Sequence, residues 1–291
     1  MKLKVFKKGF NFSQDGPGNR LVLHLQGCNM RCPWCSNPEG LELHGSLIVD
    51  KTTVVDSLCP YGALCDGVRK TQICEKCTDR ECVAARNRST GIRLSCEDIE
   101  NDELVALAVD SKAMFFKGGG VTLSGGEPTL QFSAVKDLLE KLKGNGINTA
   151  METNGTSHLL EELIPLIDHL FIDFKIPDSA KHLALTGVPD DMIRKNICIA
   201  EKRHANLIVR TPLIAGINDS NEDIEAFLSF YHENSITRSG FEFLPYFDYG
   251  RVKWEQCGME YCMNDDAHIN KNTFDLFVER FKEKGLRVVK T

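Results

Sequence analysis

The chain of 291 residues lacks any apolar run as long as the roughly 18–20 residues that a membrane-spanning helix needs. Its first ten residues, MKLKVFKKGF, carry basic charge but no apolar signal core follows them, so we expect no export signal and a cytoplasmic location. An excess of basic charge is also missing, because the formal net charge is −6, which argues against nucleic acid as the main partner. These absences, together with an ordinary apolar content of 42%, favour a globular enzyme with no membrane partner.

Cysteine, in contrast, is abundant, with 12 residues in a chain that lacks an export signal. In that setting, cysteines are expected to be metal ligands rather than disulfide partners. Three lie between residues 28 and 35 and six between residues 59 and 96. The remaining ones are Cys198, expected as a buried thiol on a helix, and Cys257 and Cys262, which we leave unassigned. Exposed thiolate clusters oxidise in air, so we expect an anaerobic or strongly reducing environment.

Cys28, Cys32 and Cys35 follow an apolar stretch at the spacing C-x3-C-x2-C. An iron–sulfur cube has four iron corners and normally takes four thiolates, but no fourth cysteine occurs before Cys59. One iron is therefore left for a ligand that the protein does not supply, as in metal sites that keep an open position. The alternative is a zinc knuckle or chance thiols, although zinc clips usually pair two-cysteine units and none of the eight histidines is at ligand spacing nearby.

Strand and helix patterns alternate along most of the chain. Strands are expected at 20–27, 121–123, 146–153, 169–175, 207–214 and 241–246, and helices at about 98–110, 133–143, 157–167, 190–204, 221–234 and 272–284. Six strands, each followed by a helix, make a parallel sheet with right-handed crossovers. Candidate functional residues follow the strands at their carboxyl ends. We therefore predict an α/β fold, an incomplete (β/α)6 barrel of the TIM type, rather than a flat doubly wound sheet.

Residues 59–96 interrupt this alternation. The segment has six cysteines in 38 residues and few large apolar side chains, and such a segment needs a metal to hold it together. We predict two domains, a discontinuous barrel formed by residues 1–58 and 97–291 and a cysteine-rich insert at 59–96.

Several motifs, in order, resemble the radical S-adenosylmethionine (SAM) superfamily and, within it, the glycyl-radical-enzyme activating enzymes of the pyruvate formate-lyase activase type. Besides the cysteine motif they are DGPGNR (Asp15–Arg20), SNPEG (Ser36–Gly40), GGGVTLSGGEP (Gly118–Pro128), ETNG (Glu152–Gly155), DFK (Asp173–Lys175), RTPLIAGIND (Arg210–Asp219) and LPY (Leu244–Tyr246). The resemblance implies an oxidoreductase that cleaves SAM at a [4Fe-4S] cluster. The resulting 5′-deoxyadenosyl radical then abstracts hydrogen from a glycine of a partner enzyme.

The resemblance also assigns residues. Cys28, Cys32 and Cys35 would hold the SAM cluster, and no side chain beyond the cofactor shell is needed as a catalyst. The expected cofactor-binding residues are Trp34, Ser36, Gly125, Gly126, Glu127, Glu152, Asp173, Lys175 and Arg210. Three alternatives remain open. Trp34 could cover the cluster, and Gly125–Glu127 could be a tight turn. Four charged residues could form a structural ion-pair cluster, namely Glu152, Asp173, Lys175 and Arg210. Asp15–Arg20 resembles the segment that faces the partner. One departure is Phe247, where relatives commonly carry histidine.

Many such activases carry a ferredoxin-like insert with two further cubes, which need eight cysteines. With six, this insert can complete one additional [4Fe-4S] cluster. We expect its ligands to be Cys59, Cys74, Cys77 and Cys82, with Cys65 or Cys96 as the alternative fourth ligand. A zinc site or a degenerate, shielding insert is the other interpretation. Its seven Lys or Arg against four Asp or Glu favour an acidic electron donor such as a flavodoxin or ferredoxin.

We therefore expect a monomeric enzyme whose protein substrate is a glycyl radical enzyme. Two rival functions remain at this point. One is a radical SAM enzyme that acts on a small molecule or another peptide. The other is a non-enzymatic electron-transfer or zinc-binding protein, which would not cleave SAM at all.

Overall fold

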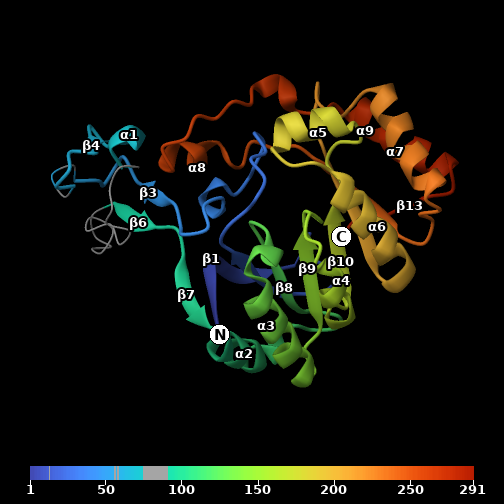
Figure 1. Cartoon of the computed structure of the whole chain (residues 1–291), viewed down its shortest axis with the longest axis horizontal. Coiled ribbons are helices and arrows are strands. Elements are labelled where there is room, and N and C mark those ends of the chain that lie inside the picture. The colour runs from blue at the N-terminus through green and yellow to red at the C-terminus, as the bar shows by residue number, and fades with distance from the viewer. Residues whose placement is uncertain (13, 56, 58, 75–90) are drawn as a thin grey trace.

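The computed structural model describes all residues except 13, 56, 58 and 75–90. Its main feature is a nine-stranded sheet in the order β13-β12-β11-β10-β9-β8-β2-β1-β7 (Figure 1). The strands are β1 (Lys2–Asn11), β2 (Arg20–Leu25), β7 (Glu97–Glu100), β8 (Gly120–Gly125), β9 (Thr149–Thr153), β10 (His169–Asp173), β11 (Leu207–Leu213), β12 (Gly240–Pro245) and β13 (Arg287–Val288). From β2 to β13 every neighbouring pair is parallel.

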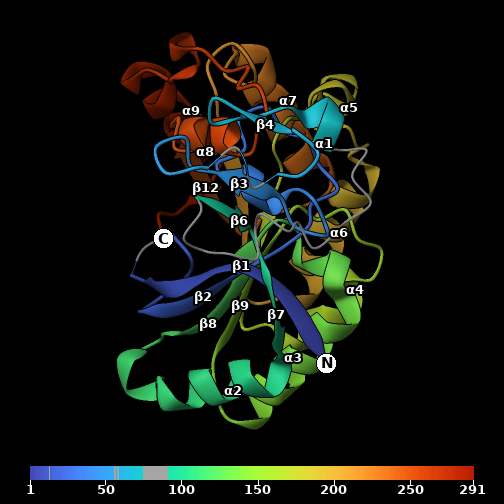
Figure 2. The same cartoon turned by 90° about the vertical axis from the view of Figure 1, so that its left-hand side faces the viewer.

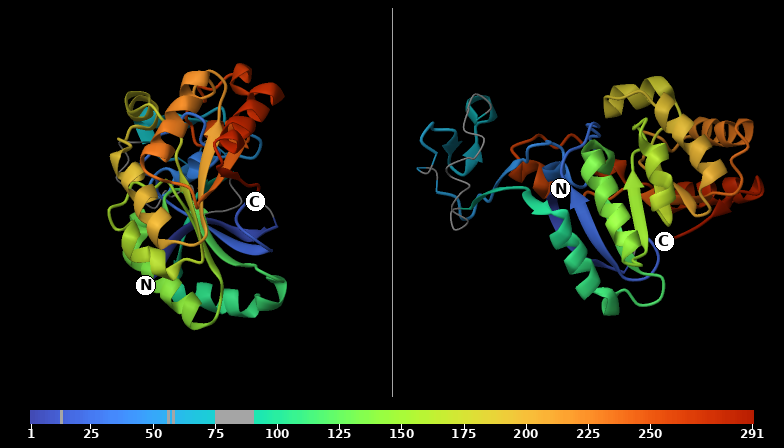
Figure 3. Two further views of the ribbon diagram at one scale, coloured as in Figure 1. Left: turned by 90° about the vertical axis from the view of Figure 1, so that its right-hand side faces the viewer. Right: turned by 60° about the horizontal axis from the view of Figure 1, so that its bottom comes forward.

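Helices form the crossovers between these parallel strands. They are α2 (Asn101–Asp110), α3 (Phe132–Gly144), α4 (Leu160–Leu163), α5 (Ser179–Thr186), α6 (Asp191–Arg203), α7 (Asn221–Glu233), α8 (Arg251–Gln256) and α9 (Lys271–Glu283). Figure 3 shows α6, α7 and α9 along the outer side of the sheet. Among the described residues, no helix is both long and apolar enough to cross a membrane.

The two faces of the sheet differ in polarity because side chains alternate along each strand. On the outer face Leu23, Leu123 and Ile172 belong to one large apolar core with the helices. The inner face carries buried polar side chains, including Thr122 and Arg210. The α/β class, the mostly parallel sheet and the six predicted strands are confirmed, and the arrangement agrees with an incomplete barrel.

The edge formed by β1 and β7 was not predicted. β1 pairs antiparallel with β2, and β7 pairs antiparallel with β1 from Lys2 to Val5. The strand pattern is weak there, because the sequence of β1, KLKVFKKGFN, has lysines that interrupt the alternation of apolar and polar residues. This edge carries the insert, since β7 is the strand by which the chain returns to the main sheet.

The insert stands off from the main sheet in Figure 1, and in Figure 2 it faces the viewer. Its described elements are β4 (Leu64–Cys65), β5 (Val68–Arg69), α1 (Thr71–Cys74) and β6 (Ile92–Leu94), and β3 (Leu47–Val49), which lies before the predicted boundary at residue 59, joins them. β3 pairs with β6, and β4 pairs with β5. A small core of Leu47, Val49, Leu64 and Ile92 holds them together. The domain boundary at residue 59 and the ferredoxin-like character of the insert stay predictions.

Candidate functional site

The loop after β2 carries the three cysteines and closes on itself. The Gly27 N–H donates to the Gly40 carbonyl at 2.8 Å, and the Cys28 N–H donates to the Leu41 carbonyl at 2.9 Å. Gly27 has φ +97°, a backbone conformation that glycine adopts readily. The loop from Gly27 to Leu41 is therefore held at both ends, at the carboxyl edge of the parallel sheet.

The cysteines open onto a cavity of about 300 Å³ at this edge, at the lower end of the range for ligand pockets. The sequence-predicted residues that line it together are Cys28, Cys32, Cys35, Trp34, Ser36, Gly125, Gly126, Glu152, Asp173, Lys175 and Arg210. Lining residues without an assigned role in the sequence include Met30, Asn37, Ser124, Thr153, Asn154, Pro212 and Leu244. Residues from a loop and five strands thus converge on one space.

Of the three thiols of the cavity, Cys32 is buried and Cys28 and Cys35 are half-buried. Burial raises the pKa of Cys28 to about 11 and that of Cys32 to about 12, and it also raises the pKa of Cys35. The charge of Lys175 acts in the opposite direction on all three. A bound iron would supply the stronger positive charge that holds the thiolate form.

The donor set fits an iron–sulfur cluster better than a single ion. Within the described part of the chain, no three His, Cys, Asp or Glu side chains stand together in a way that could hold one metal ion. A cube differs, because each thiolate takes a different iron corner. Three thiols in one cavity beside a buried ammonium therefore match a cluster with one corner open to a further ligand.

Asp173 and Lys175 form an ion pair at the end of β10, with Lys175 only 12% exposed at its side chain. Burial alone would lower the pKa of Lys175, but the negative charge of Asp173 raises it overall. Lys175 therefore remains an ammonium next to the cysteine loop. The pair can act on a cofactor or simply cap the barrel, and its role stays a prediction.

Arg210 is engaged entirely within the protein. Its Nε donates to Glu242 at 2.7 Å, a second nitrogen pairs with Glu152, and the third donates to the Gln14 carbonyl and to Thr291. The guanidinium also lies 3.9 Å from the centre of the Phe171 ring. This matches the ion-pair cluster that was left open as an alternative, and pairing with a SAM carboxylate stays a prediction.

Glu242 was missed by the sequence reasoning. It is 2% exposed and lies beside Arg210 in the register of β11 and β12. A glutamate inside the apolar strand GFEFLP was the available signal, because a buried carboxylate needs a partner. Burial also raises the pKa of Glu152, although Arg210 and a 2.6 Å hydrogen bond from Ser124 oppose this.

The Gly125–Glu127 segment packs mainly against protein. A side chain at Gly125 would meet the backbone of Leu25, and one at Gly126 would meet the Gly27 carbonyl. Glu127 lies outside the cavity lining, is fully buried, and accepts hydrogen bonds from Thr129, Thr153 and the Asn154 N–H. The segment is thus a tight turn that fixes the cysteine loop, and direct contact of Glu127 with a cofactor stays a prediction.

Helix α8 holds the cysteine loop from outside, a contact that no sequence signal indicated. Trp254 donates its indole N–H to the Cys35 carbonyl at 2.9 Å, and Lys253 donates to the Ser36 carbonyl at 2.8 Å. A side chain at Gly250 would lie 2.4 Å from the Cys35 oxygen, so backbone meets backbone there. The same helix contacts β3 of the insert.

The DGPGNR segment is partly structural. Arg20 is completely buried and donates to Thr122 at 2.6 Å and to the Val121 carbonyl at 2.9 Å. Asn19 is also buried. Their burial leaves them unable to meet a partner, so a partner-facing role can apply only to the residues before Asn19.

Phe247 lies outside the cavity lining and stacks on Tyr249 at 5.2 Å between ring centres. A histidine from another segment is close by, because the His268 ring lies 5.3 Å from Tyr246 and 6.4 Å from Phe247. His268 is exposed, bonds through Nδ1 to the Asp265 carbonyl at 2.9 Å and also lies outside the cavity lining.

The insert cysteines are only partly described. Cys59 and Cys74 both pack against the small apolar core of the insert. Cys65 is exposed, and Cys96 lies in a different cavity beside β1. Cys77 and Cys82 lie outside the described residues, so the ligands of an additional cluster stay a prediction. Of the scattered cysteines, Cys198 is half-buried, Cys257 is buried and Cys262 is exposed.

Comparison with known proteins agrees with this geometry. Residues 22–230 match the family model of the radical SAM superfamily. The chain is 32% identical to the 4-hydroxyphenylacetate decarboxylase activating enzyme of Clostridioides difficile (strain 630), over 94% of this chain and 90% of the relative. It is 33% identical to the choline trimethylamine-lyase activating enzyme of Oleidesulfovibrio alaskensis, over 85% of this chain and 84% of the relative.

Solved structures show the same fold. Streptococcus suis SuiB bound to the precursor peptide SuiA matches with a TM-score of 0.53 at 14% identity, over 92% of this chain and 47% of that one. A radical SAM methyltransferase from Sphaerobacter thermophilus matches with a TM-score of 0.52 at 13% identity, over 68% of this chain and 58% of that one. With the family match and the curated relatives, the chain belongs to the radical SAM superfamily and, within it, to the family of these activating enzymes.

Proposed function

We propose that this protein activates a glycyl radical enzyme. The observation that carries the proposal is the cavity in which Cys28, Cys32 and Cys35 meet the strand-end residues, in a chain of the activating-enzyme family. When bound there, a [4Fe-4S] cluster and SAM would supply a 5′-deoxyadenosyl radical, which takes a hydrogen atom from a glycine of the partner.

The residues of this chain bind and orient rather than transfer protons. The three cysteines would hold three corners of the cluster, and the ion pair of Asp173 and Lys175 offers an acceptor and a donor to SAM. Trp34, Ser36, Gly125 and Gly126 would close the cavity around it. Arg210 and Glu152, which line the cavity, would be held in place on the inner face of the sheet by their hydrogen bonds with each other and with Glu242.

The proposal includes partners and conditions. The protein substrate is a glycyl radical enzyme, and the reducing electron comes from a flavodoxin or ferredoxin. We further propose an additional [4Fe-4S] cluster in the insert, a monomeric state and a cytoplasmic, anaerobic setting. The clustered cysteines support the additional cluster and the anaerobic setting, and the excess of basic residues in the insert sequence supports an acidic donor.

Anaerobic reconstitution with iron and sulfide tests the enzyme. With SAM and dithionite, the protein should release 5′-deoxyadenosine, and a Cys32→Ala variant should not. If no 5′-deoxyadenosine forms in the wild type, the protein is an electron-transfer or zinc-binding protein instead. If it forms but no candidate partner acquires a radical, the substrate is a small molecule or another peptide.

A further inference from the structure

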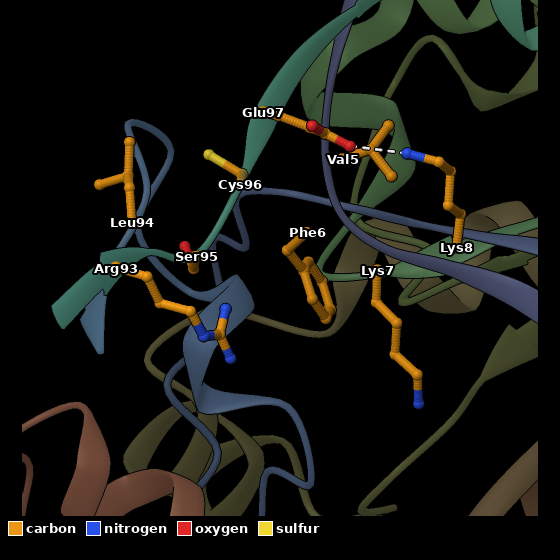
Figure 4. A pocket seen from close by; sticks show the side chains of 9 residues that line it. All are labelled: Val5, Phe6, Lys7, Lys8, Arg93, Leu94, Ser95, Cys96 and Glu97. Atoms are coloured by element: carbon orange, nitrogen blue, oxygen red, sulfur yellow. Dashed lines mark hydrogen bonds and ion pairs between the residues drawn. The ribbon is translucent and has the colours of Figure 1, made fainter. Parts of the chain in front are cut away.

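A second cavity lies on the outside of the molecule, where β1 meets the base of the insert. It measures about 480 Å³ and is lined by Val5, Phe6, Lys7, Lys8 and residues 93–97 (Figure 4). We call it the β1–insert groove. It shares no lining residue with the cysteine cavity.

The groove is cationic in a protein whose net charge is −6. Lys8 is neutralised by Glu97 at 2.6 Å, and Lys4 on the same strand by Asp98 at 2.8 Å. Lys7 and Arg93, in contrast, have no ion-pair partner within the described part of the chain. Figure 4 shows both side chains extending past the Phe6 ring, one on either side of it. Two cationic side chains without ion-pair partners at one opening favour a negatively charged binding partner.

The floor of the groove touches the backbone of the cysteine loop. The Phe6 ring packs directly on Gly40, where an added side chain would lie 2.6 Å from the ring. Gly40 accepts the hydrogen bond from Gly27, the residue before Cys28, at 2.8 Å. One aromatic side chain and one backbone hydrogen bond therefore connect the groove to the first cysteine.

The charge of Lys7 also affects the pKa of His24 on β2. The His24 ring lies 5.5 Å from the Phe6 ring, and the pKa of His24 is lowered to about 4, first by burial and then by Lys7. Phe6 lines the groove and contacts His24 of β2, so it connects the groove with that strand. A molecule bound in the groove is thus close to the cysteine loop without entering its cavity.

We propose that the β1–insert groove docks a small acidic electron-transfer protein that reduces the cluster held by Cys28, Cys32 and Cys35. This inference rests on the proposed function and specifies where its donor binds. With a cluster bound there, one electron would pass from the reduced donor to it, which would oxidise the donor by one electron without forming or breaking a bond. Complementary charge orients the donor and speeds its association.

The test is a charge reversal, Lys7→Glu with Arg93→Glu, measured with reduced flavodoxin as the probe. At low salt, the flavodoxin concentration for half-maximal 5′-deoxyadenosine release should rise about tenfold, and its dependence on salt should weaken. With dithionite, which needs no docking surface, the rate should equal that of the wild type. The matched control is Lys195→Glu with Lys284→Glu, two exposed lysines away from the groove, and it should leave both rates unchanged.

An unchanged flavodoxin dependence in the groove variant would overturn the proposal. So would a loss seen only in radical formation on the partner enzyme at saturating dithionite, because the groove would then bind the protein substrate. If the reversed variant fails to fold, Lys7→Gln with Arg93→Gln replaces it, and flavodoxin binding is titrated from low to high salt. In that titration, a flavodoxin affinity of the variant equal to that of the wild type would contradict docking in the groove. Failure of the proposed function is distinct, since wild-type enzyme would release no 5′-deoxyadenosine even with dithionite.

Discussion

At the scale of single residues, the cysteines differ in what surrounds them. Cys28, Cys32 and Cys35 line one cavity beside Lys175, whereas Cys198 lies on α6 away from it. Replacing Cys32 with serine should abolish binding of the cluster in this cavity, because a cube with two protein thiolates is poorly held, and should leave only the iron of the cluster proposed for the insert. Iron and sulfide analysis and the visible absorption spectrum measure this. The control Cys198→Ser should keep full iron, and full iron in Cys32→Ser would contradict the assignment.

A second prediction at the scale of single residues concerns Arg210. It is 4% exposed at its side chain and neutralises Glu242, which is 2% exposed. Arg210→Lys cannot reproduce its forked contacts, so the free energy of unfolding should fall by about 3 kcal/mol. Chemical denaturation measures this against Arg203→Lys, whose exposed pair with Glu161 should contribute less than about 1 kcal/mol. Equal, small effects at both sites would show that the buried network adds no stability.

At the scale of elements, α8 is the unexpected support of the site. Trp254→Phe removes the hydrogen bond to the Cys35 carbonyl while keeping an aromatic ring. We expect a stability loss of about 1 kcal/mol and a changed electron paramagnetic resonance spectrum and reduction potential of the cluster. Tyr249→Phe, on a ring 72% exposed, is the control. A spectrum identical to the wild type in Trp254→Phe would show that α8 does not position the ligand.

The contact of Gly250 with Cys35 gives a further prediction for α8. A methyl group at Gly250 would lie 2.4 Å from the Cys35 oxygen, so Gly250→Ala must push the helix away from the loop. Thermal unfolding should occur at lower temperature, by a shift of several degrees. Gly144→Ala at the end of α3 meets nothing within 4 Å and should be neutral or slightly stabilising. A neutral Gly250→Ala would disprove close packing at this point.

At the scale of the whole molecule, the sequence predicted the parallel part of the sheet and, except for Glu127, the candidate residues that line one cavity at its edge. Both predictions rest on local sequence patterns, because the periodicity of a strand and the residues that follow its end lie within a short segment of the chain. The α8 contact could not be predicted, because Trp254 and Cys35 are 219 positions apart and nothing local links them. The partners of Arg210 depended likewise on strand register, which places Glu242 beside it.

The transfer of a labelled hydrogen atom tests the central claim most directly. A candidate glycyl radical enzyme would be prepared with deuterated glycine and incubated anaerobically with the reconstituted enzyme, SAM and dithionite. We predict 5′-deoxyadenosine that carries one deuterium atom, because the hydrogen comes from a glycine of the partner. Release of 5′-deoxyadenosine without deuterium from this mixture would contradict the account.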